Sequence, residues 1–92
     1  MIFFKIKKDE RQLSAVNIRT GQMVGAVTYV KEQGRIVITD LFSWEEDARV
    51  EHRLLTAMQR LAKKEACELC AADYLSKDIF AWAIERDQIP FC

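Results

Sequence analysis

The segment DLFSWEEDARVEHRLLTAM, residues 40–58, runs from an apolar stretch into one where charged residues alternate with apolar ones. The point where a strand ends and a helix begins is a common phosphate site, because the first helical amides lack partners and the helix dipole attracts an anion. This junction carries Glu45, Glu46 and Asp47 and has no glycine. The carboxylates already complement the dipole, so a bound phosphate would have to displace them.

Two cysteines, Cys67 and Cys70, form a C-x-x-C pair, the spacing of zinc ribbons and of thioredoxin-like redox sites. In a strand, this odd separation sends the thiols to opposite faces, and only His52 and Cys92 remain as further ligands. We therefore expect no metal site and interpret the pair as small buried apolar residues. Three cysteines do not suggest a disulfide framework and are typical of a reducing compartment.

Three arginines, Arg49, Arg53 and Arg60, follow the junction and could line one side of a helix as an anion-binding stripe. The alternative is a mixed, solvated surface, which the interleaved Glu51 and the overall charge balance favour. His52 has charged neighbours and is interpreted as a solvated surface histidine.

Composition limits the class of protein. The 92 residues form a single domain, 1–92, and half of them are apolar, which is typical of a globular fold. Because 14 basic residues balance 14 acidic ones, we expect no nucleic-acid partner. No apolar run approaches the roughly 18 residues of a membrane span, and no secretory signal is recognisable. We expect a cytoplasmic protein without membrane contact.

The first half of the chain predicts a four-stranded antiparallel meander. Its strands are rich in aromatic and β-branched residues and are separated by charged or glycine-containing turns. They are expected at residues 2–7, 12–20, 23–30 and 35–42. Gly25 lies inside the third strand, where a missing side chain indicates a bulge or a close backbone approach.

A long helix is predicted next. Ser43 and Glu46 have the spacing of a capping box, and apolar residues then recur at intervals of three and four up to Ala62. The segment ACELCAADYL, residues 66–75, fits a strand or a helix by periodicity alone. We interpret it as a fifth strand parallel to the fourth, because it lies between two helical patterns. Ser76 or Asp78 then caps a last helix that ends before Pro90.

This order of elements resembles the GNAT superfamily of acyl-CoA-dependent N-acyltransferases, an α/β (α+β) fold. Two local sequence segments agree with this resemblance. DLF, a capped turn and V-x-x-x-LL resemble the family's strand end, cofactor loop and helix start. DIFAWAIERDQIPF is similar to the family's closing helix and the aromatic turn after it. The chain lacks the family's opening strand with its helix pair and its closing strands.

The resemblance implies where acetyl-CoA or another acyl-CoA would bind. The residues at the family's cofactor positions are Leu41, Phe42, Arg49, Val50 and Arg53. The family's loop, however, has glycines that bring backbone amides to the pyrophosphate, and here Asp47, Arg49 and Glu51 stand in their places. The motif is absent, so we expect no cofactor unless the chain is an enzyme.

The resemblance also implies two catalytic candidates. Asp40 matches a position where the family often has an acid, and its alternative role is a strand-end carboxylate in solvent. The family's tyrosine position falls near Trp82 and Ala83, which offer no hydroxyl, so Tyr74 would have to supply the proton. The alternative for Tyr74 is a partly buried aromatic residue with a solvated hydroxyl.

We therefore expect a reduced GNAT-like binding or self-associating module, with an acyltransferase that has an atypical cofactor loop as the alternative. Trp44 and Trp82 fit either a contact surface or the core of a small domain, and the second is favoured. A homodimer is expected through the edge of the fifth strand, near Trp82, Ile89 and Phe91, because the chain offers little to cover that edge. The alternative is a monomer in which the last residues, PFC, fold back over that edge. A protein partner is a further possibility.

Overall fold

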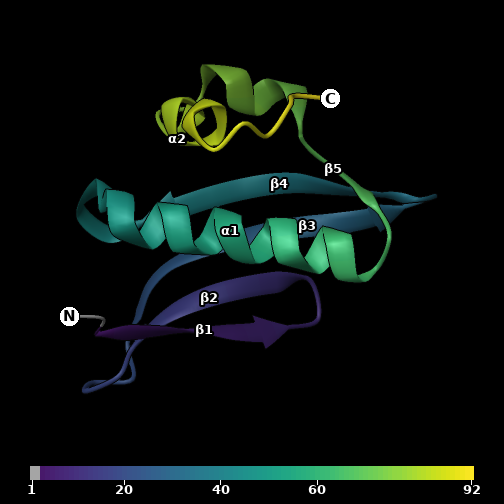
Figure 1. Ribbon diagram of the computed structural model, residues 1–92. Helices are drawn as coiled ribbons and strands as arrows, with labels where there is room; N and C mark the ends of the chain where they lie inside the picture. Colours follow the sequence, from purple (N-terminus) through teal and green to yellow (C-terminus); the bar gives the residue numbers. More distant parts are fainter. Residues whose placement is uncertain (1–2) are drawn as a thin grey trace.

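The computed structural model describes residues 3–92, apart from the side chain of Glu45. At its centre is one five-stranded sheet, in which the strand order follows the chain order (Figure 1). The first four strands form an antiparallel meander, and the fifth is parallel to the fourth. The strands are β1 (Phe4–Asp9), β2 (Gln12–Asn17), β3 (Met23–Glu32), β4 (Arg35–Ser43) and β5 (Glu68–Ala71). This α+β arrangement confirms the predicted fold class.

The long helix α1 (Ala48–Lys64) crosses one face of the sheet, as Figure 1 shows. One turn of 3-10 helix, η1 (Trp44–Glu46), joins it to β4. After β5 the chain forms a second 3-10 helix, η2 (Asp73–Lys77), and then the short helix α2 (Ala81–Arg86). None of the helices in residues 3–92 has the length and apolar character that a membrane crossing needs.

The predicted closing helix is present and ends before Pro90, but its predicted cap at Ser76 or Asp78 was wrong, because α2 begins at Ala81. Asp78 has extended backbone angles and separates η2 from α2. Its carboxylate accepts the amide of Phe80 at 2.9 Å, so the aspartate stabilises the turn before α2. The predicted strand 66–75 is likewise limited to β5, because Ala66 still belongs to the turn that ends α1.

The core lies between α1 and the sheet. The apolar residues of α1 that face it are buried and confirm the predicted stripe: Val50, Leu54, Leu55, Met58, Leu61 and Ala62. They belong to the same cluster as buried residues of the strands, among them Phe4, Leu13, Val27, Ile36, Ile38 and Leu41. Burial of this stripe, and not helix propensity alone, holds α1 on the sheet.

Gly25 brings the first turn of α1 close to β3. A Cβ atom at this position would lie 2.6 Å from Cγ1 of Val50 and 2.9 Å from the carbonyl oxygen of Phe42. The strand register also shifts between Ala15 and Val16, opposite this part of β3. The sequence predicted a bulge or a close approach at Gly25, and the structure has both.

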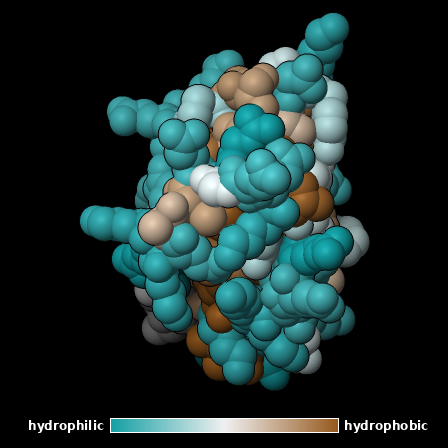
Figure 2. Space-filling view, turned by 90° about the vertical axis from the view of Figure 1, so that its right-hand side faces the viewer, coloured by the Kyte–Doolittle hydropathy of each residue, from teal (hydrophilic) through white to brown (hydrophobic). Residues whose placement is uncertain are grey.

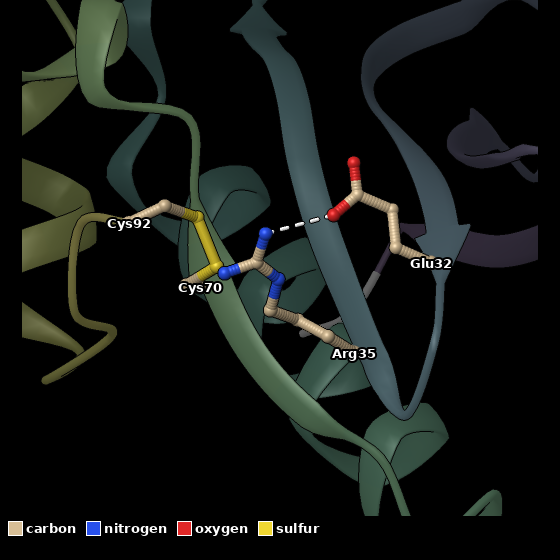
Figure 3. Close-up of a disulfide and its surroundings, with 4 residues drawn as sticks. All are labelled: Glu32, Arg35, Cys70 and Cys92. Carbon is tan, nitrogen blue, oxygen red and sulfur yellow. Dashed lines mark hydrogen bonds and ion pairs between the residues drawn. A yellow bond between two sulfur atoms is a disulfide. The ribbon is translucent and has the colours of Figure 1, made fainter.

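The C-terminal segment lies along β5. The amide of Ala71 donates to the carbonyl of Pro90 at 2.8 Å, and the amide of Cys92 donates to the carbonyl of Ala71 at the same distance. A disulfide joins Cys70 to Cys92, on the same side of the sheet as Arg35 in the view of Figure 3. This segment covers part of the β5 edge that the sequence left uncovered. The expectation of unpaired cysteines is corrected too, since only Cys67 is free in the part of the chain that the structure describes.

The two ends of the sheet differ in character. Figure 2 looks onto the end that carries the β3–β4 turn, which is covered mainly by hydrophilic residues. At the other end, Phe3, Ile18, Met23 and Trp44 are exposed. The indole of Trp44 donates to the carbonyl of Met23 at 2.7 Å but is 64% exposed. The favoured prediction that both tryptophans pack in the core was therefore wrong, because Trp82 is also 44% exposed.

Candidate functional site

The first turn of α1 is capped by Asp47. Its carboxylate accepts the backbone amide of Arg49 at 2.9 Å and pairs with the guanidinium of Arg49 at 3.0 and 3.2 Å. Hydrogen bonds from Arg49 hold the pKa of Asp47 below its usual value. The predicted capping box was wrong: Ser43 makes no side-chain cap bond, since η1 intervenes between it and α1.

Glu51 lies in the same turn but is fully buried, with no exposed surface. The hydroxyl of Ser43 donates to its Oε2 at 2.6 Å, and Oε1 has no partner among the described residues. Burial raises the pKa of this carboxyl, and the bond from Ser43 only partly opposes the shift. Ser43 is thus used by Glu51, which explains why it is not available as a cap.

These carboxylates occupy the place where the resemblance predicts a pyrophosphate. Asp47 holds the amide of Arg49, and Glu51 lies buried where the family has a glycine. Glu46 adopts a φ of 51°, the left-handed region that favours glycine. The backbone therefore takes one glycine-like conformation here, but the amide of Arg49 is already bonded to the carboxylate of Asp47.

The two catalytic candidates come near each other. β4 and β5 pair as far as Ile38 and Ala71, and the strands separate beyond the bond from the amide of Ala72 to the carbonyl of Ile38. The hydroxyl of Tyr74 bridges this separation by donating to the carbonyl of Thr39 at 2.7 Å. Thr39 precedes Asp40 in the chain. Tyr74 is 60% exposed, so the alternative of a partly buried ring was wrong.

Asp40 makes a local contact. Its carboxylate accepts the amide of Leu41 at 2.9 Å, and the residue is exposed. This matches its alternative role as a strand-end carboxylate in solvent. The hydroxyl of Tyr74 is engaged with backbone and the carboxylate of Asp40 with its own neighbour, so the pair forms no acid–base couple in this structure.

The five predicted cofactor residues do not converge on one site. Leu41 and Val50 are buried in the core, and Phe42 is partly exposed on β4. The guanidinium of Arg49 lies over the ring of Phe3, 4.8 Å from its centroid. That of Arg53 lies over the ring of Phe4 at 5.4 Å, so both guanidinium groups contact aromatic rings at the start of the chain.

His52 has a specific partner. Its Nδ1 lies 3.0 Å from Oδ1 of Asp87, which also pairs with Arg86. Within residues 3–92 no group of three His, Cys, Asp or Glu side chains could hold a metal ion. The spacing of the cysteines gave no signal for the pairing of Cys70 with Cys92, because 22 positions separate them in the chain.

A groove along α1 is a feature that sequence reasoning missed. Its volume is about 590 Å³ and it is lined by Ile6, His52, Arg53, Thr56, Ala57 and Arg60. Two observations favour a mixed surface over an arginine stripe in the sequence: the interleaved Glu51 and the overall charge balance. Glu51 is buried, so the first does not hold. The spacing indicates this burial, since residue 51 lies three, four and seven positions before Leu54, Leu55 and Met58.

No model of a known protein family matches the chain, and no curated protein matches it.

Proposed function

We propose that this chain is a reduced GNAT-like binding module that holds no acyl-CoA at the start of α1. The observation that carries the proposal is the bond from the amide of Arg49 to the carboxylate of Asp47. A diphosphate at this position would have to displace that carboxylate and lie close to a second one, Glu51, that is already desolvated. The positive end of the helix dipole is therefore compensated by the carboxylate of Asp47 and not by a ligand.

A titration with acetyl-CoA tests this proposal. We expect no saturable heat for the wild-type chain by calorimetry. A dissociation constant in the micromolar range that does not depend on the arginines Arg53 and Arg60 would support the alternative, an acyltransferase that holds its donor through strand amides. The hydroxyl of Tyr74 at the carbonyl of Thr39 is the contact that favours the alternative, because it places a phenol where β4 and β5 separate.

The variant Asp47→Ser tests whether the negative charge of Asp47 or the conformation of the loop prevents acetyl-CoA from binding. Serine is as good a helix cap as aspartate but carries no charge. If Asp47→Ser binds acetyl-CoA and the wild type does not, the carboxylate alone prevents binding, and the loop retains the family's geometry. The matched control is Asp73→Ser, which removes one exposed carboxylate from η2 instead.

We also propose that the module associates with a second copy of itself. Ile79, in the turn before α2, and Trp82, in the first turn of α2, are 66% and 44% exposed. Large exposed apolar side chains on a small domain are typical of a contact surface. The chain has no net charge to oppose association of two copies. The edge of β5 is a poorer contact than the sequence suggested, because residues 90–92 lie against it.

A further inference from the structure

The groove between β1 and α1 is built from side chains of both elements. Ile6 of β1 and Ala57 of α1 contribute apolar surface, Arg53 and Arg60 contribute guanidinium donors, and His52 contributes an imidazole ring. In Figure 1, α1 lies in front of the sheet, and β1 is the edge strand beside it. The volume of about 590 Å³ is within the range of small-molecule sites.

The charged residues that line the groove are all positive. Among the residues that line it, none is a carboxylate. Of the ion pairs that the described residues form, none involves Arg53 or Arg60, whereas Arg49 is paired with Asp47. Glu51, the acid nearest to Arg53 in the sequence, is buried with Ser43, and Glu65, the acid nearest to Arg60, pairs with Lys31. Two guanidinium groups therefore face the groove without an internal counter-charge.

The spacing along α1 places a hydroxyl between the two guanidinium groups. Thr56 is three residues after Arg53 and four before Arg60, which corresponds to about 4.5 Å and about 6 Å along the helix axis. All three residues lie on one side of the helix. Arginine side chains are long enough for both to reach a group that lies over Thr56. The ring of Phe4 beneath Arg53 limits the orientations of that guanidinium.

His52 adds a further polar group at the end of the groove. Its Nδ1 faces the carboxylate of Asp87, so this nitrogen carries the proton and donates it. The ring is thereby held in one orientation, and Nε2 of the neutral ring is an acceptor that offers no proton to a phosphate. An anion in the groove is therefore recognised by the two guanidinium groups and the hydroxyl of Thr56. Asp87 is itself almost buried and paired with Arg86, so its charge is already compensated.

We propose that this groove binds a small phosphomonoester whose apolar part lies on Ile6 and Ala57. A phosphomonoester has three terminal oxygens, enough for two guanidinium forks and the hydroxyl of Thr56, whereas a carboxylate has two. Arginine is suited to phosphate because its planar fork makes two parallel hydrogen bonds. The site is distinct from the start of α1, so the inference goes beyond the proposed function and does not depend on it.

Phenyl phosphate is a suitable probe, followed by calorimetry and by amide chemical shifts of the full chain. We expect saturable binding, with shifts concentrated at residues 52–60 and at Ile6. Inorganic phosphate and benzoate should each bind at least about tenfold more weakly, since one lacks the apolar part and the other the third oxygen. No saturation by about 10 mM, or equal binding of benzoate, would overturn the proposal.

Variants locate the site. Arg53→Gln and Arg60→Gln should each weaken phenyl phosphate binding at least about tenfold, because each removes a charged fork. Arg19→Gln, at an exposed arginine in the β2–β3 turn, is the matched control and should bind as the wild type does. Arg53→Gln also loses the contact with the ring of Phe4. If that variant unfolds, the measurement on Arg60→Gln decides the result. Unchanged affinity in a folded Arg60→Gln chain would contradict the proposal.

The same variants keep this inference separate from the proposed function, because acetyl-CoA also carries phosphates. Acetyl-CoA binding that is lost in Arg60→Gln would belong to the groove and support the phosphate site. Acetyl-CoA binding that persists in Arg60→Gln and strengthens in Asp47→Ser would place the ligand at the start of α1. That result would contradict the proposed function and leave the phenyl phosphate measurement to decide on the groove.

Discussion

Glu51 shows how one side chain changes the interpretation of a whole surface. On the outside of α1 it would neutralise the neighbouring arginines, but inside it leaves them free to act together. Burial of Glu51 costs free energy, because its carboxyl loses contact with solvent and its Oε1 has no hydrogen-bond partner among the described residues. The position of Asp40 was easier to predict: it is a strand-end carboxylate, as its place in the sequence suggested.

The buried carboxyl should make stability depend on pH. Because burial raises the pKa of Glu51 in the folded state, ionisation of this group favours unfolding. The stability associated with its neutral form is complete below about pH 4.3, the ordinary glutamate pKa, and is lost as the pH rises through the folded pKa. Glu51→Gln keeps the bond from Ser43 and cannot ionise, so its gain over the wild type should grow with pH.

Urea unfolding of both chains at several pH values between about 4 and 8 measures this difference. Glu85→Gln, which changes an exposed glutamate on α2, is the control and should follow the wild-type curve. If the free energy of unfolding of Glu51→Gln differs from that of the wild type by the same amount at every pH, the carboxyl does not titrate in this range.

At the level of elements, α1 was the best predicted part of the fold because its apolar residues recur with the helical period. Its start was predicted less well. Ser43 and Glu46 have the sequence spacing of a capping box, but Ser43 still pairs with Gly25 as the last residue of β4. The strand thus extends into the supposed cap, and Asp47 caps α1 instead. Sequence spacing cannot show such competition between neighbouring elements for one residue.

The stripe of α1 predicts a large effect of truncation. Met58 is fully buried between the helix and the sheet, so Met58→Ala leaves a cavity and should cost about 2–5 kcal/mol of the free energy of unfolding. Lys63→Ala, on the exposed side of the same helix, should change it by less than about 0.5 kcal/mol. Chemical denaturation of the two variants is the measurement. Equal values for both would mean that the helix does not pack as described.

The end of α1 predicts a stabilising change. Ala66 has a φ of 54°. Two backbone hydrogen bonds close the turn around it: the amide of Cys67 donates to the carbonyl of Ala62, and the amide of Ala66 donates to the carbonyl of Lys63. This is a Schellman turn with alanine where glycine is preferred, so Ala66→Gly should raise stability by about 0.4–1 kcal/mol. Ala57→Gly, within the helix, should lower it by about 1 kcal/mol. A thermal melt that ranks the two in the opposite order would refute the assignment of this turn.

For the whole molecule, the sheet order and the fold class followed from the sequence, but the route of the last residues did not. Turn signals and alternation define the meander. Nothing local indicates that Cys92 returns to Cys70, because the contact depends on how η2 and α2 are placed. Disulfides persist mainly in oxidising compartments, so the pairing removes the cysteine argument for a reducing one. The cytoplasmic location stays a prediction.

The disulfide should contribute measurably to stability. It closes a loop of 22 residues, and the loss of chain entropy in the unfolded state corresponds to about 3 kcal/mol. Cys92→Ser should therefore lower the free energy of unfolding by about this amount. Cys67→Ser is the matched control, because Cys67 is free. Urea unfolding with and without a reducing agent completes the test: the reductant should destabilise the wild type and leave Cys92→Ser unchanged.

Self-association is also a property of the whole molecule. Light scattering at micromolar concentration should give twice the mass of one chain, and Trp82→Glu should return it to the monomer because it places a charge in the proposed contact. Trp44→Glu changes the other exposed indole, at the start of η1, and should leave the dimer intact. Phe91→Glu would not be a clean test, since Phe91 bridges to Ala71 within the chain. A single-chain mass that does not change with concentration would exclude the dimer.

The agreement between strand order and chain order has a consequence for how quickly the protein folds. Each of the four antiparallel strands pairs with its neighbour in the sequence, so most of the sheet can form from contacts between nearby residues. Chains with such local contacts fold faster than those whose pairings are distant. The parallel pairing of β5 must wait for α1 to cross the sheet, and the attachment of residues 90–92 must wait for β5. We therefore expect the β1–β4 meander and α1 to form the folding nucleus, with closure of the Cys70–Cys92 bond as the slow final phase.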